Sequence, residues 1–200
     1  MYLVSTNKQK HGSANPFMKL AIGRFHGQVR AMLPQPVESL LEVGCGEGYS
    51  ARAILGDQPR RPWFGGDLEH SAVVEARRRF PAMHYTVFDA TKLPFPDASV
   101  DAIMSLEVME HLPDPKRALQ EFRRVARHHL VLSVPNDPVY RALRLVTGKG
   151  WSMWGDHPEH IQHWSTGQFV AFLESEGVRV QRVVSPGPFA WTIAVCDLRL

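Results

Sequence analysis

Three glycines at alternate positions, Gly44, Gly46 and Gly48, restrict the fold of this chain more than any other feature. They follow a short apolar stretch, 40–43, and precede a helical pattern that begins near Tyr49. This order predicts a buried strand, a tight turn and a helix N-terminus. Glycine lacks a Cβ and tolerates positive φ, so such a turn lets a ligand approach the backbone, and the helix behind it offers free N–H groups. The stretch therefore indicates a nucleotide-like ligand.

The spacing of these glycines narrows the choice of ligand. The dinucleotide fingerprint G-x-G-x-x-G ends in a glycine that packs the helix on the strand, and Tyr49 occupies that position here. The phosphate loop G-x-x-x-x-G-K-[ST] is absent from the sequence. An NAD-linked oxidoreductase is therefore disfavoured.

Length and composition predict a single globular domain over 1–200, because the 200 residues are 44% hydrophobic and 22% charged. Cys45 and Cys196 form neither a metal-ligand spacing nor a disulfide framework, which suits a cytoplasmic location. The polar start of the chain lacks the apolar core of a signal peptide, and no apolar run is long enough to span a bilayer. The isoelectric point near 9 leaves nucleic acid open as a partner. The basic pairs and triplets lie inside helical patterns, however, and are interpreted as solvated helix faces. We therefore do not expect nucleic acid as a binding partner.

Strands and helices alternate along most of the chain, which predicts a doubly wound, mostly parallel α/β sheet covered on both faces. We expect strands at 40–43, 63–66, 84–88, 100–104 and 130–134, and helices that begin at 16, 49, 70 and 115, with a shorter one at 140–146. Asn15 and Asp114 are the expected caps of the helices that begin at 16 and 115, and the helical spacing of apolar residues places Phe17 on the inner face of the first. Ser165 and Gln168 form a capping-box pattern for a last helix, 166–176. Strands at 178–184 and 189–196 then form a hairpin, so at least one strand runs antiparallel.

These elements divide the expected domain into four parts. They are an N-terminal helix region (1–36), a cofactor-binding core (37–136), a substrate cover (137–165) and a C-terminal helix and hairpin (166–200). The sequence does not indicate an oligomeric state.

Acidic residues mark the carboxyl ends of the first three expected strands, at Glu42, Asp67 and Asp89. In an open α/β sheet, ligands bind outside these ends. Asp67 can accept two hydrogen bonds from a ribose diol, Asp89 can accept from an adenine amine, and Glu42 can face a ligand ammonium. Three carboxylates would repel the phosphates of a nucleotide. The combination of ammonium, diol and amine describes S-adenosylmethionine.

The motifs from the first strand onward resemble, in the same order, small class I S-adenosylmethionine-dependent methyltransferases. The group includes ubiquinone-biosynthesis O-methyltransferases. The matching segments are Leu41–Gly48, Gly66–Leu68, Asp89–Ala90 with Leu93–Phe95, Val100–Asp101 and Glu107–Leu112. The resemblance implies a Rossmann-like sheet of seven strands whose last strand is antiparallel.

The resemblance also implies which residues contact the cofactor. On the matching positions these are Glu42, Gly44, Cys45, Gly46, Gly48, Asp67, Leu68, Asp89, Ala90 and Leu106. It further implies direct SN2 transfer of the methyl group to an O, N or C nucleophile of a small-molecule acceptor. A general base depends on the acceptor, and His111 is the candidate for it.

Glu107, Glu110 and His111 stand at i, i+3 and i+4, so they share one face if the segment is helical. Together with a distant histidine from 157–163 they could bind a divalent metal. Glu-His-Leu at this place is common in the wider family without a metal, and we expect none.

The segment 151–164 is rich in tryptophan and histidine and is the expected substrate cover. We therefore assign His111, His160 and Trp164 to the acceptor, although the segment could equally be a small local core. Two alternatives remain open: a protein that binds the cofactor without catalysis, and an RNA-end methyltransferase.

Overall fold

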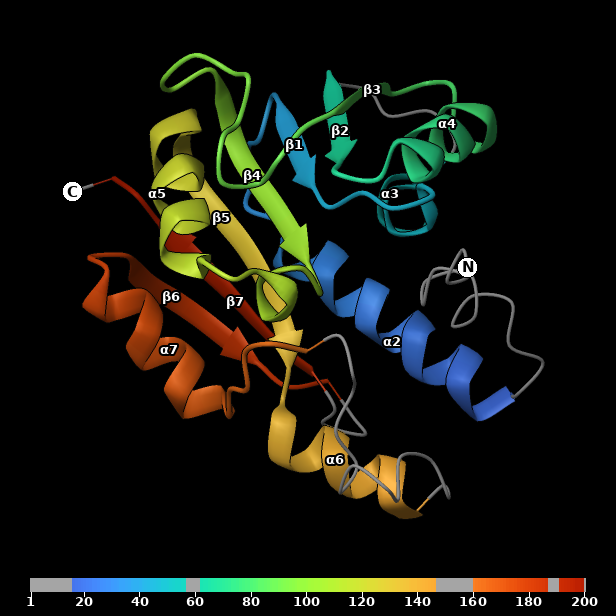
Figure 1. The fold of residues 1–200 in the computed structure, drawn as a ribbon, viewed down its shortest axis with the longest axis vertical. Coiled ribbons are helices and arrows are strands. Elements are labelled where there is room, and N and C mark those ends of the chain that lie inside the picture. Colours follow the sequence, from blue (N-terminus) through green and yellow to red (C-terminus); the bar gives the residue numbers. More distant parts are fainter. Residues whose placement is uncertain (1–15, 57–61, 147–159, 187–190, 200) are drawn as a thin grey trace.

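The computed structural model describes residues 16–56, 62–146, 160–186 and 191–199. Within these residues the chain forms one seven-stranded sheet with helices on both faces (Figure 1). The strands are β1 Leu40–Val43, β2 Trp63–Asp67, β3 His84–Val87, β4 Val100–Leu106, β5 Ala126–Pro135, β6 Arg179–Val184 and β7 Trp191–Asp197. The expected α/β fold and its strand count are confirmed.

The strand order is β3-β2-β1-β4-β5-β7-β6. The first five strands pair in parallel, and β7 runs antiparallel to both of its neighbours, β5 and β6. This confirms the expected C-terminal hairpin and its antiparallel strand. The order along the chain reverses between β1 and β4, so the carboxyl ends of these strands border the crevice where ligands bind in such sheets.

The helices follow the capping signals of the sequence. They are α2 Pro16–Met32, α3 Tyr49–Leu55, α4 His70–Arg79, α5 Pro115–Val125, α6 Asp137–Val146 and α7 Thr166–Ser175, with a 3₁₀ turn, η1, at Met109–His111. Asp114 caps α5 by accepting a hydrogen bond from the Arg117 N–H at 2.9 Å. Ser165 and Gln168 form the expected capping box of α7. Among the described residues, no helix is both long and apolar enough to cross a membrane.

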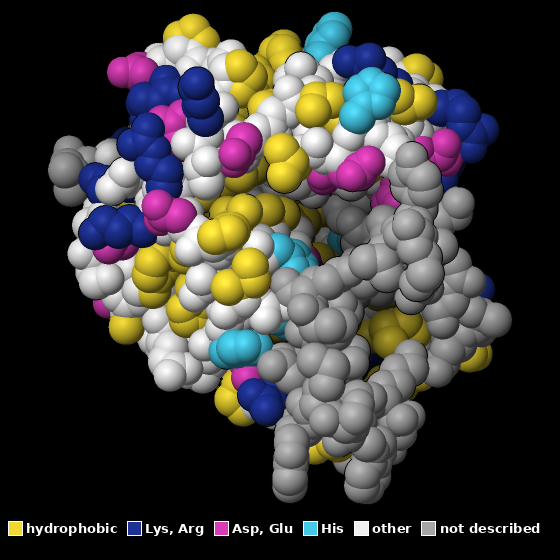
Figure 2. All heavy atoms as spheres, in the orientation of Figure 1, with side chains coloured by type: hydrophobic (Ala, Val, Ile, Leu, Met, Phe, Trp, Pro, Cys, Tyr) yellow, Lys and Arg dark blue, Asp and Glu magenta, His cyan; other side chains and the backbone are white. Residues whose placement is uncertain are grey.

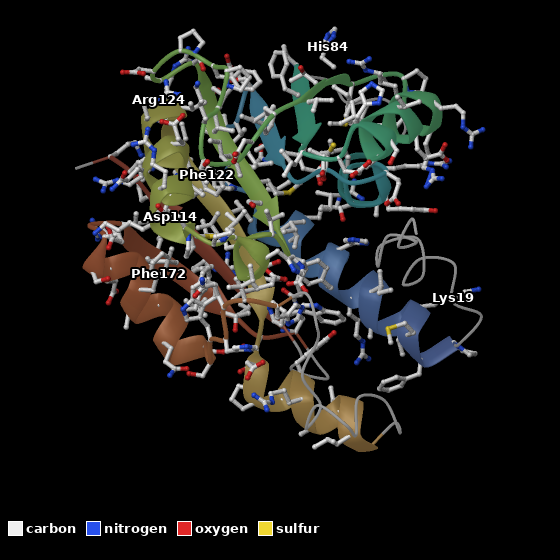
Figure 3. The ribbon with its side chains drawn as sticks, in the orientation of Figure 1. Lys19, His84, Asp114, Phe122, Arg124 and Phe172 are labelled. Atoms are coloured by element: carbon white, nitrogen blue, oxygen red, sulfur yellow. The ribbon has the colours of Figure 1, made fainter. Side chains whose placement is uncertain are left out.

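Side chains alternate between two cores, one on each face of the sheet. Leu40, Ala102 and Val131 pack with α2, α3 and α4, whereas their neighbours along the strands pack with α5 and α7. Figure 3 shows Phe122 pointing from α5 toward the sheet and Lys19 pointing away from α2. Phe122 is fully buried, which contributes roughly 1.5–3 kcal/mol to stability.

Some elements differ from the sequence expectations. β5 begins at Ala126, directly after α5, rather than at residue 130, because β4 pairs with it from Val100 onward. β4 continues to Leu106 because Ser105 and Leu106 pair with β5. Phe17, expected on the inner face of α2, is 60% exposed. Residues 147–159 of the expected substrate cover, and the expected cap Asn15, lie outside the described residues.

Candidate functional site

The carboxyl ends of β1 to β4 form one edge of the sheet, and the expected acids lie along it. Strand pairing places β1 between β2 and β4, with β3 beyond β2. Glu42, Asp67 and Asp89 therefore follow one another across three adjacent strands. In Figure 2, acidic side chains lie above a hollow near the middle of the face, and histidine side chains lie at and below it. This edge is the candidate site.

The glycine turn adopts the backbone conformation that its sequence predicts. Gly44, Gly46 and Gly48 all have positive φ, at 79°, 49° and 78°. The N–H groups of Gly44 and Cys45 both donate to the Gly66 carbonyl, at 2.8 and 2.9 Å. These bonds fasten the turn to β2. A Cβ at Gly44 would collide with the Val108 side chain, so glycine is required here for conformation and for space.

Glu42 is deeply buried in β1, with 2% of its surface exposed. Its Oε2 atom has no hydrogen-bond partner among the described residues. Burial, and to a lesser extent the neighbouring Asp67 carboxylate, raises the pKa of Glu42 from 4.5 to about 8. Because a buried carboxyl without a partner is costly, a positively charged ligand group at this place would stabilise its charged form. Glu42 is therefore suited to the ammonium group that the sequence analysis assigned to it.

Asp67 at the end of β2 is oriented by two backbone donors. Its Oδ2 accepts from the Gly46 N–H at 2.8 Å, and its Oδ1 accepts from the Glu69 N–H at 3.0 Å. A carboxylate offers about four lone-pair positions, so each oxygen can still accept from a hydroxyl. The geometry joins Asp67 to the glycine turn and leaves it able to hold a ribose diol.

Asp89 is exposed one residue beyond Phe88, which follows the end of β3. Its Oδ1 accepts from the N–H and from the hydroxyl of Thr91, both at 2.8 Å. This Asx turn fixes the direction of the carboxylate. The neighbouring Ala90 is buried, as are Cys45 and, in β4, Leu106, whereas Leu68 beside Asp67 is 72% exposed. The burial of Cys45 also raises the pKa of its thiol, so it is a poor nucleophile.

Glu107 departs from the helical arrangement proposed for it. It lies outside η1 and has a positive φ of 59°. Its carboxylate accepts from the Trp191 indole N–H at 2.9 Å and from the Ser133 hydroxyl at 3.2 Å. Glu107, Glu110 and His111 would share one face only in a helical segment, and that condition is not met, because the chain makes a single 3₁₀ turn that begins after Glu107.

The residues assigned to the acceptor divide into two groups. The rings of His111 and His160 approach each other, with centroids 5.1 Å apart. Trp164 packs against Phe169 and Phe172 of α7, with ring centroids at 5.5 and 5.4 Å. The structure thus brings His160 to His111, and it gives Trp164 a place in the core beside α7. The assignment of all three to the acceptor stays a prediction.

Val108 and Trp191 both shape this edge, although neither is expected to from the sequence. Val108 lies against Gly44, and Trp191 bonds to Glu107 across 84 positions of sequence. Neither contact leaves a local signal, since each depends on how distant strands are placed. Thr91 did leave one, because Asp followed two residues later by Thr favours an Asx turn.

Two cavities lie at the opposite edge of the sheet, where the strands begin. One, of about 370 Å³, borders Leu40 and Trp63, and the other, of about 490 Å³, borders Asp101 and His129. They are therefore separate from the acids and the glycine turn.

Known proteins have sequences similar to this chain, and one family model spans most of this edge. A family model described as "Methyltransferase domain" matches residues 41–132. A Mycobacterium tuberculosis protein named "probable S-adenosylmethionine-dependent methyltransferase" is 39% identical over 99 residues, covering 48% of this chain and 35% of that protein. A Mycolicibacterium smegmatis protein with a similar name is 31% identical over 144 residues, covering 71% of this chain and 52% of that protein. The chain thus spans about a third to a half of the length of these relatives.

Solved structures share the fold along the whole chain. The S-adenosylmethionine-dependent methyltransferase of Aquifex aeolicus superposes with a TM-score of 0.70, covering 98% of this chain and 100% of that one, at 18% identity. This likeness shows the fold alone. Residues 41–132 match the methyltransferase domain model, and the chain is similar in sequence to proteins named as probable S-adenosylmethionine-dependent methyltransferases.

Proposed function

We propose that this chain binds S-adenosylmethionine at the carboxyl edge of the sheet and transfers its methyl group to a small-molecule acceptor. The observation that carries the proposal is the row of carboxylates on three adjacent strands, in the spatial order Glu42, Asp67, Asp89. In that order they suit an ammonium, a ribose diol and an adenine amine. The same order would be unfavourable for a row of phosphates, because like charges repel.

The residues at this edge fit the cofactor in two independent ways. The buried Glu42 Oε2 atom, which has no partner among the described residues, needs a cationic or donor group. Asp67, held by the Gly46 and Glu69 N–H groups, is already oriented to accept further hydrogen bonds. The exposed Leu68 side chain offers an apolar surface beside Asp67.

The remaining cofactor contacts come from the turn and from neighbouring strand ends. Gly44, Cys45, Gly46 and Gly48 would line the cofactor with backbone, while Ala90 and Leu106 would contact it from the segments at the ends of β3 and β4. Val108 keeps the chain after β4 close to Gly44, so a residue larger than glycine would close this approach.

The chemistry requires little from the protein beyond placement. When bound, S-adenosylmethionine supplies a methyl group on a positively charged sulfur, which an acceptor can displace directly. The chain must hold the acceptor atom in line with the bond between the methyl group and the sulfur, and it must exclude water. His111 is suited to the acceptor side, since it is the last residue of η1 and its side chain is 33% exposed, and it could take a proton from an acceptor hydroxyl or amine.

Calorimetry of the full chain with S-adenosylhomocysteine, and separately with NAD, tests the cofactor. We expect heat of binding with S-adenosylhomocysteine and none with NAD, and the reverse result would reject the assignment.

Methyl transfer is tested with labelled S-adenosylmethionine, using a mixture of small hydroxyl and amine compounds in one arm and an RNA oligonucleotide in another. We expect label in the first arm. Label in the RNA arm alone would favour the RNA-end alternative, and binding without transfer in either arm would favour a non-catalytic role.

A further inference from the structure

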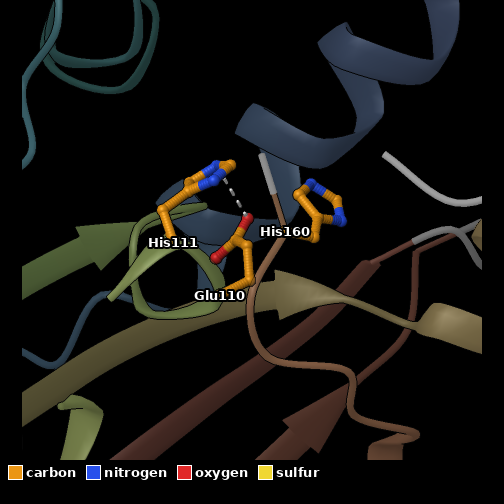
Figure 4. A group of neighbouring side chains, drawn as sticks. All are labelled: Glu110, His111 and His160. Atoms are coloured by element: carbon orange, nitrogen blue, oxygen red, sulfur yellow. Dashed lines mark ion pairs between the residues drawn. The ribbon is translucent and has the colours of Figure 1, made fainter. Parts of the chain in front are cut away.

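Glu110, His111 and His160 bring three metal-ligating side chains together at the edge of the candidate site (Figure 4). One donor atom from each residue lies within 4.8 Å of the other two. Two of these residues are adjacent in η1, and the third comes from the segment before α7, some fifty positions later. Such a convergence is specific to the folded chain.

Backbone hydrogen bonds fix this convergence. The N–H groups of Ile161 and Gln162 both donate to the Glu110 carbonyl, at 2.8 and 2.9 Å. The Gln162 side-chain amide also donates to the Leu112 carbonyl at 3.1 Å. Three bonds therefore hold the residues directly after His160 against η1. His160 is placed beside Glu110 by the backbone, so its position does not depend on its own ring contacts.

Burial differs sharply between the carboxylate and the imidazoles. Glu110 is 2% exposed, whereas the His111 side chain is 33% exposed. The His111 Nε2 atom lies 3.8 Å from Glu110 Oε1, which is longer than a hydrogen bond. Buried carboxylates are stable when they are hydrogen-bonded, paired with charge or bound to a metal. A cation between the Glu110 Oε1 and His111 Nε2 atoms would be bound by both of them directly.

We infer that Glu110, His111 and His160 form a site for a divalent transition-metal cation such as Zn²⁺. Two imidazoles and one carboxylate favour such ions over Mg²⁺ or Ca²⁺, which prefer oxygen ligands alone. Tetrahedral ligands at about 2.1 Å from a metal lie about 3.4 Å apart, so donor atoms that lie within 4.8 Å of one another must move closer to ligate one ion. His111 and His160 are both only partly buried.

Three protein ligands leave at least one coordination position for another molecule, which is the pattern of a metal site that acts on a substrate. Glu107 is held by Trp191 and Ser133 and does not join the cluster. Val108 joins this segment to the glycine turn by packing on Gly44. The inference rests on the proposed function in one respect: an acceptor that places an oxygen atom on the cation would be held beside the methyl donor.

Metal binding is tested on the full chain after a chelator has stripped any bound metal and the chelator has been removed. Zn²⁺ is titrated by calorimetry, and Co²⁺ is titrated by absorption, since its visible bands report imidazole ligation. We expect one bound ion per chain and weak or no binding of Mg²⁺. Removing only the hydrogen-bond partners of metal ligands weakens metal affinity on the order of 10- to 100-fold. We therefore expect His160→Ala and Glu110→Gln to lose at least that much affinity.

His84→Ala is the matched control, because it removes an exposed imidazole at the start of β3, at the opposite edge of the sheet. It should keep the affinity of the unmodified chain. If Glu110→Gln fails to fold, His160→Ala still decides, since His160 is only partly buried. The inference is overturned if the unmodified chain binds neither ion, or if His160→Ala binds as tightly as the unmodified chain.

The two proposals fail separately. Zn²⁺ binding without S-adenosylhomocysteine binding would reject the proposed function and leave the cation site intact. S-adenosylhomocysteine binding in the presence of chelator, with no binding of Zn²⁺ or Co²⁺, would reject only the cation site. If both proposals hold, His111 is a ligand of the cation and not the base, because the cation itself makes a bound hydroxyl easier to deprotonate. Hydroxyl acceptors should then lose methylation with chelator and regain it with Zn²⁺.

Discussion

The Trp191 indole N–H donates a hydrogen bond of 2.9 Å to the Glu107 carboxylate. This bond joins the first residue of β7 to the first residue after β4, at the edge that carries the candidate site. Trp191 also packs against Phe25 of α2, with ring centroids 5.2 Å apart. One side chain thus connects the N-terminal helix to the backbone that turns from β4 toward η1.

Trp191→Phe should lower the free energy of unfolding by up to about 1.5–3 kcal/mol beyond the effect of the smaller ring, because the partly buried Glu107 carboxylate loses a hydrogen-bond donor. Denaturant unfolding measures this change. Trp63→Phe is the control, since Trp63 and Trp191 are both 8% exposed but the Trp63 indole N–H has no partner among the described residues. Equal losses in the two variants would show that the bond to Glu107 contributes nothing.

Gly44→Ala should abolish cofactor binding and destabilise the chain. The new Cβ would collide with Val108, and the φ of 79° is unfavourable for alanine. Adding Val108→Ala should recover part of the lost stability by removing the collision, while the strain from φ remains. Thermal unfolding and S-adenosylhomocysteine calorimetry report the two effects.

Gly23→Ala is the matched control for this substitution. A Cβ at Gly23 in α2 meets nothing within 4 Å. Alanine is favoured over glycine in a helix by roughly 0.5–1 kcal/mol, so this variant should be more stable than the unmodified chain. A Gly44→Ala chain as stable as Gly23→Ala would contradict the described turn.

Local signals predicted the parts of the fold that depend on neighbours in sequence. The glycine turn, the Asp114 cap and the capping box at Ser165 each follow from a few adjacent residues, and the structure confirms all three. The acids at the strand ends were also predictable, because alternating strands and helices imply a parallel sheet whose carboxyl ends share one edge.

Contacts between distant segments could not be predicted in this way. Glu107 adopts positive φ without being glycine, and the bonds to Ser133 and Trp191 that hold it come from β5 and β7. β5 begins early because β4 pairs with it from Ala126 onward, which overrides the local pattern. His160 reaches Glu110 only because the chain after it docks on η1.

Asp67→Ala should weaken S-adenosylhomocysteine binding on the order of a hundredfold or more. It removes a charged acceptor of two ribose hydrogen bonds, worth about 1.5–3 kcal/mol each, and each 1.4 kcal/mol is about tenfold in Kd. Calorimetry measures the change. Asp114→Ala is the control, because it removes the cap of α5 and leaves the candidate site unchanged. Losing the cap should lower the free energy of unfolding by about 1 kcal/mol. An Asp67→Ala chain that binds as tightly as Asp114→Ala would show that Asp67 does not hold the ribose.

Glu42→Gln should flatten the dependence of stability on pH. The pKa of Glu42 rises from 4.5 to about 8 on folding, so the folded chain holds its proton where the unfolded chain has lost it. The stability linked to this group is therefore complete below pH 4.5 and falls as pH rises toward 8, by about 1.4 kcal/mol per pH unit. Denaturant unfolding across this range should show a steeper fall in the unmodified chain than in Glu42→Gln. Parallel curves would contradict the raised pKa.

Cofactor binding should release a proton from Glu42 near pH 7. With a pKa of about 8 the buried carboxyl is mostly neutral before binding, and a ligand ammonium against it would lower that pKa and expel the proton. Affinity for S-adenosylhomocysteine should therefore increase as pH rises from 6 to 8. Calorimetry in buffers of different ionisation enthalpy counts the protons released, and we expect close to one per chain.

Two variants serve as controls for this proton release. Glu42→Gln should release none. Glu75→Gln should behave like the unmodified chain, because a hydrogen bond from Arg78 already holds the pKa of Glu75 at about 2. Equal proton release from the unmodified chain and Glu42→Gln would place the ammonium away from Glu42.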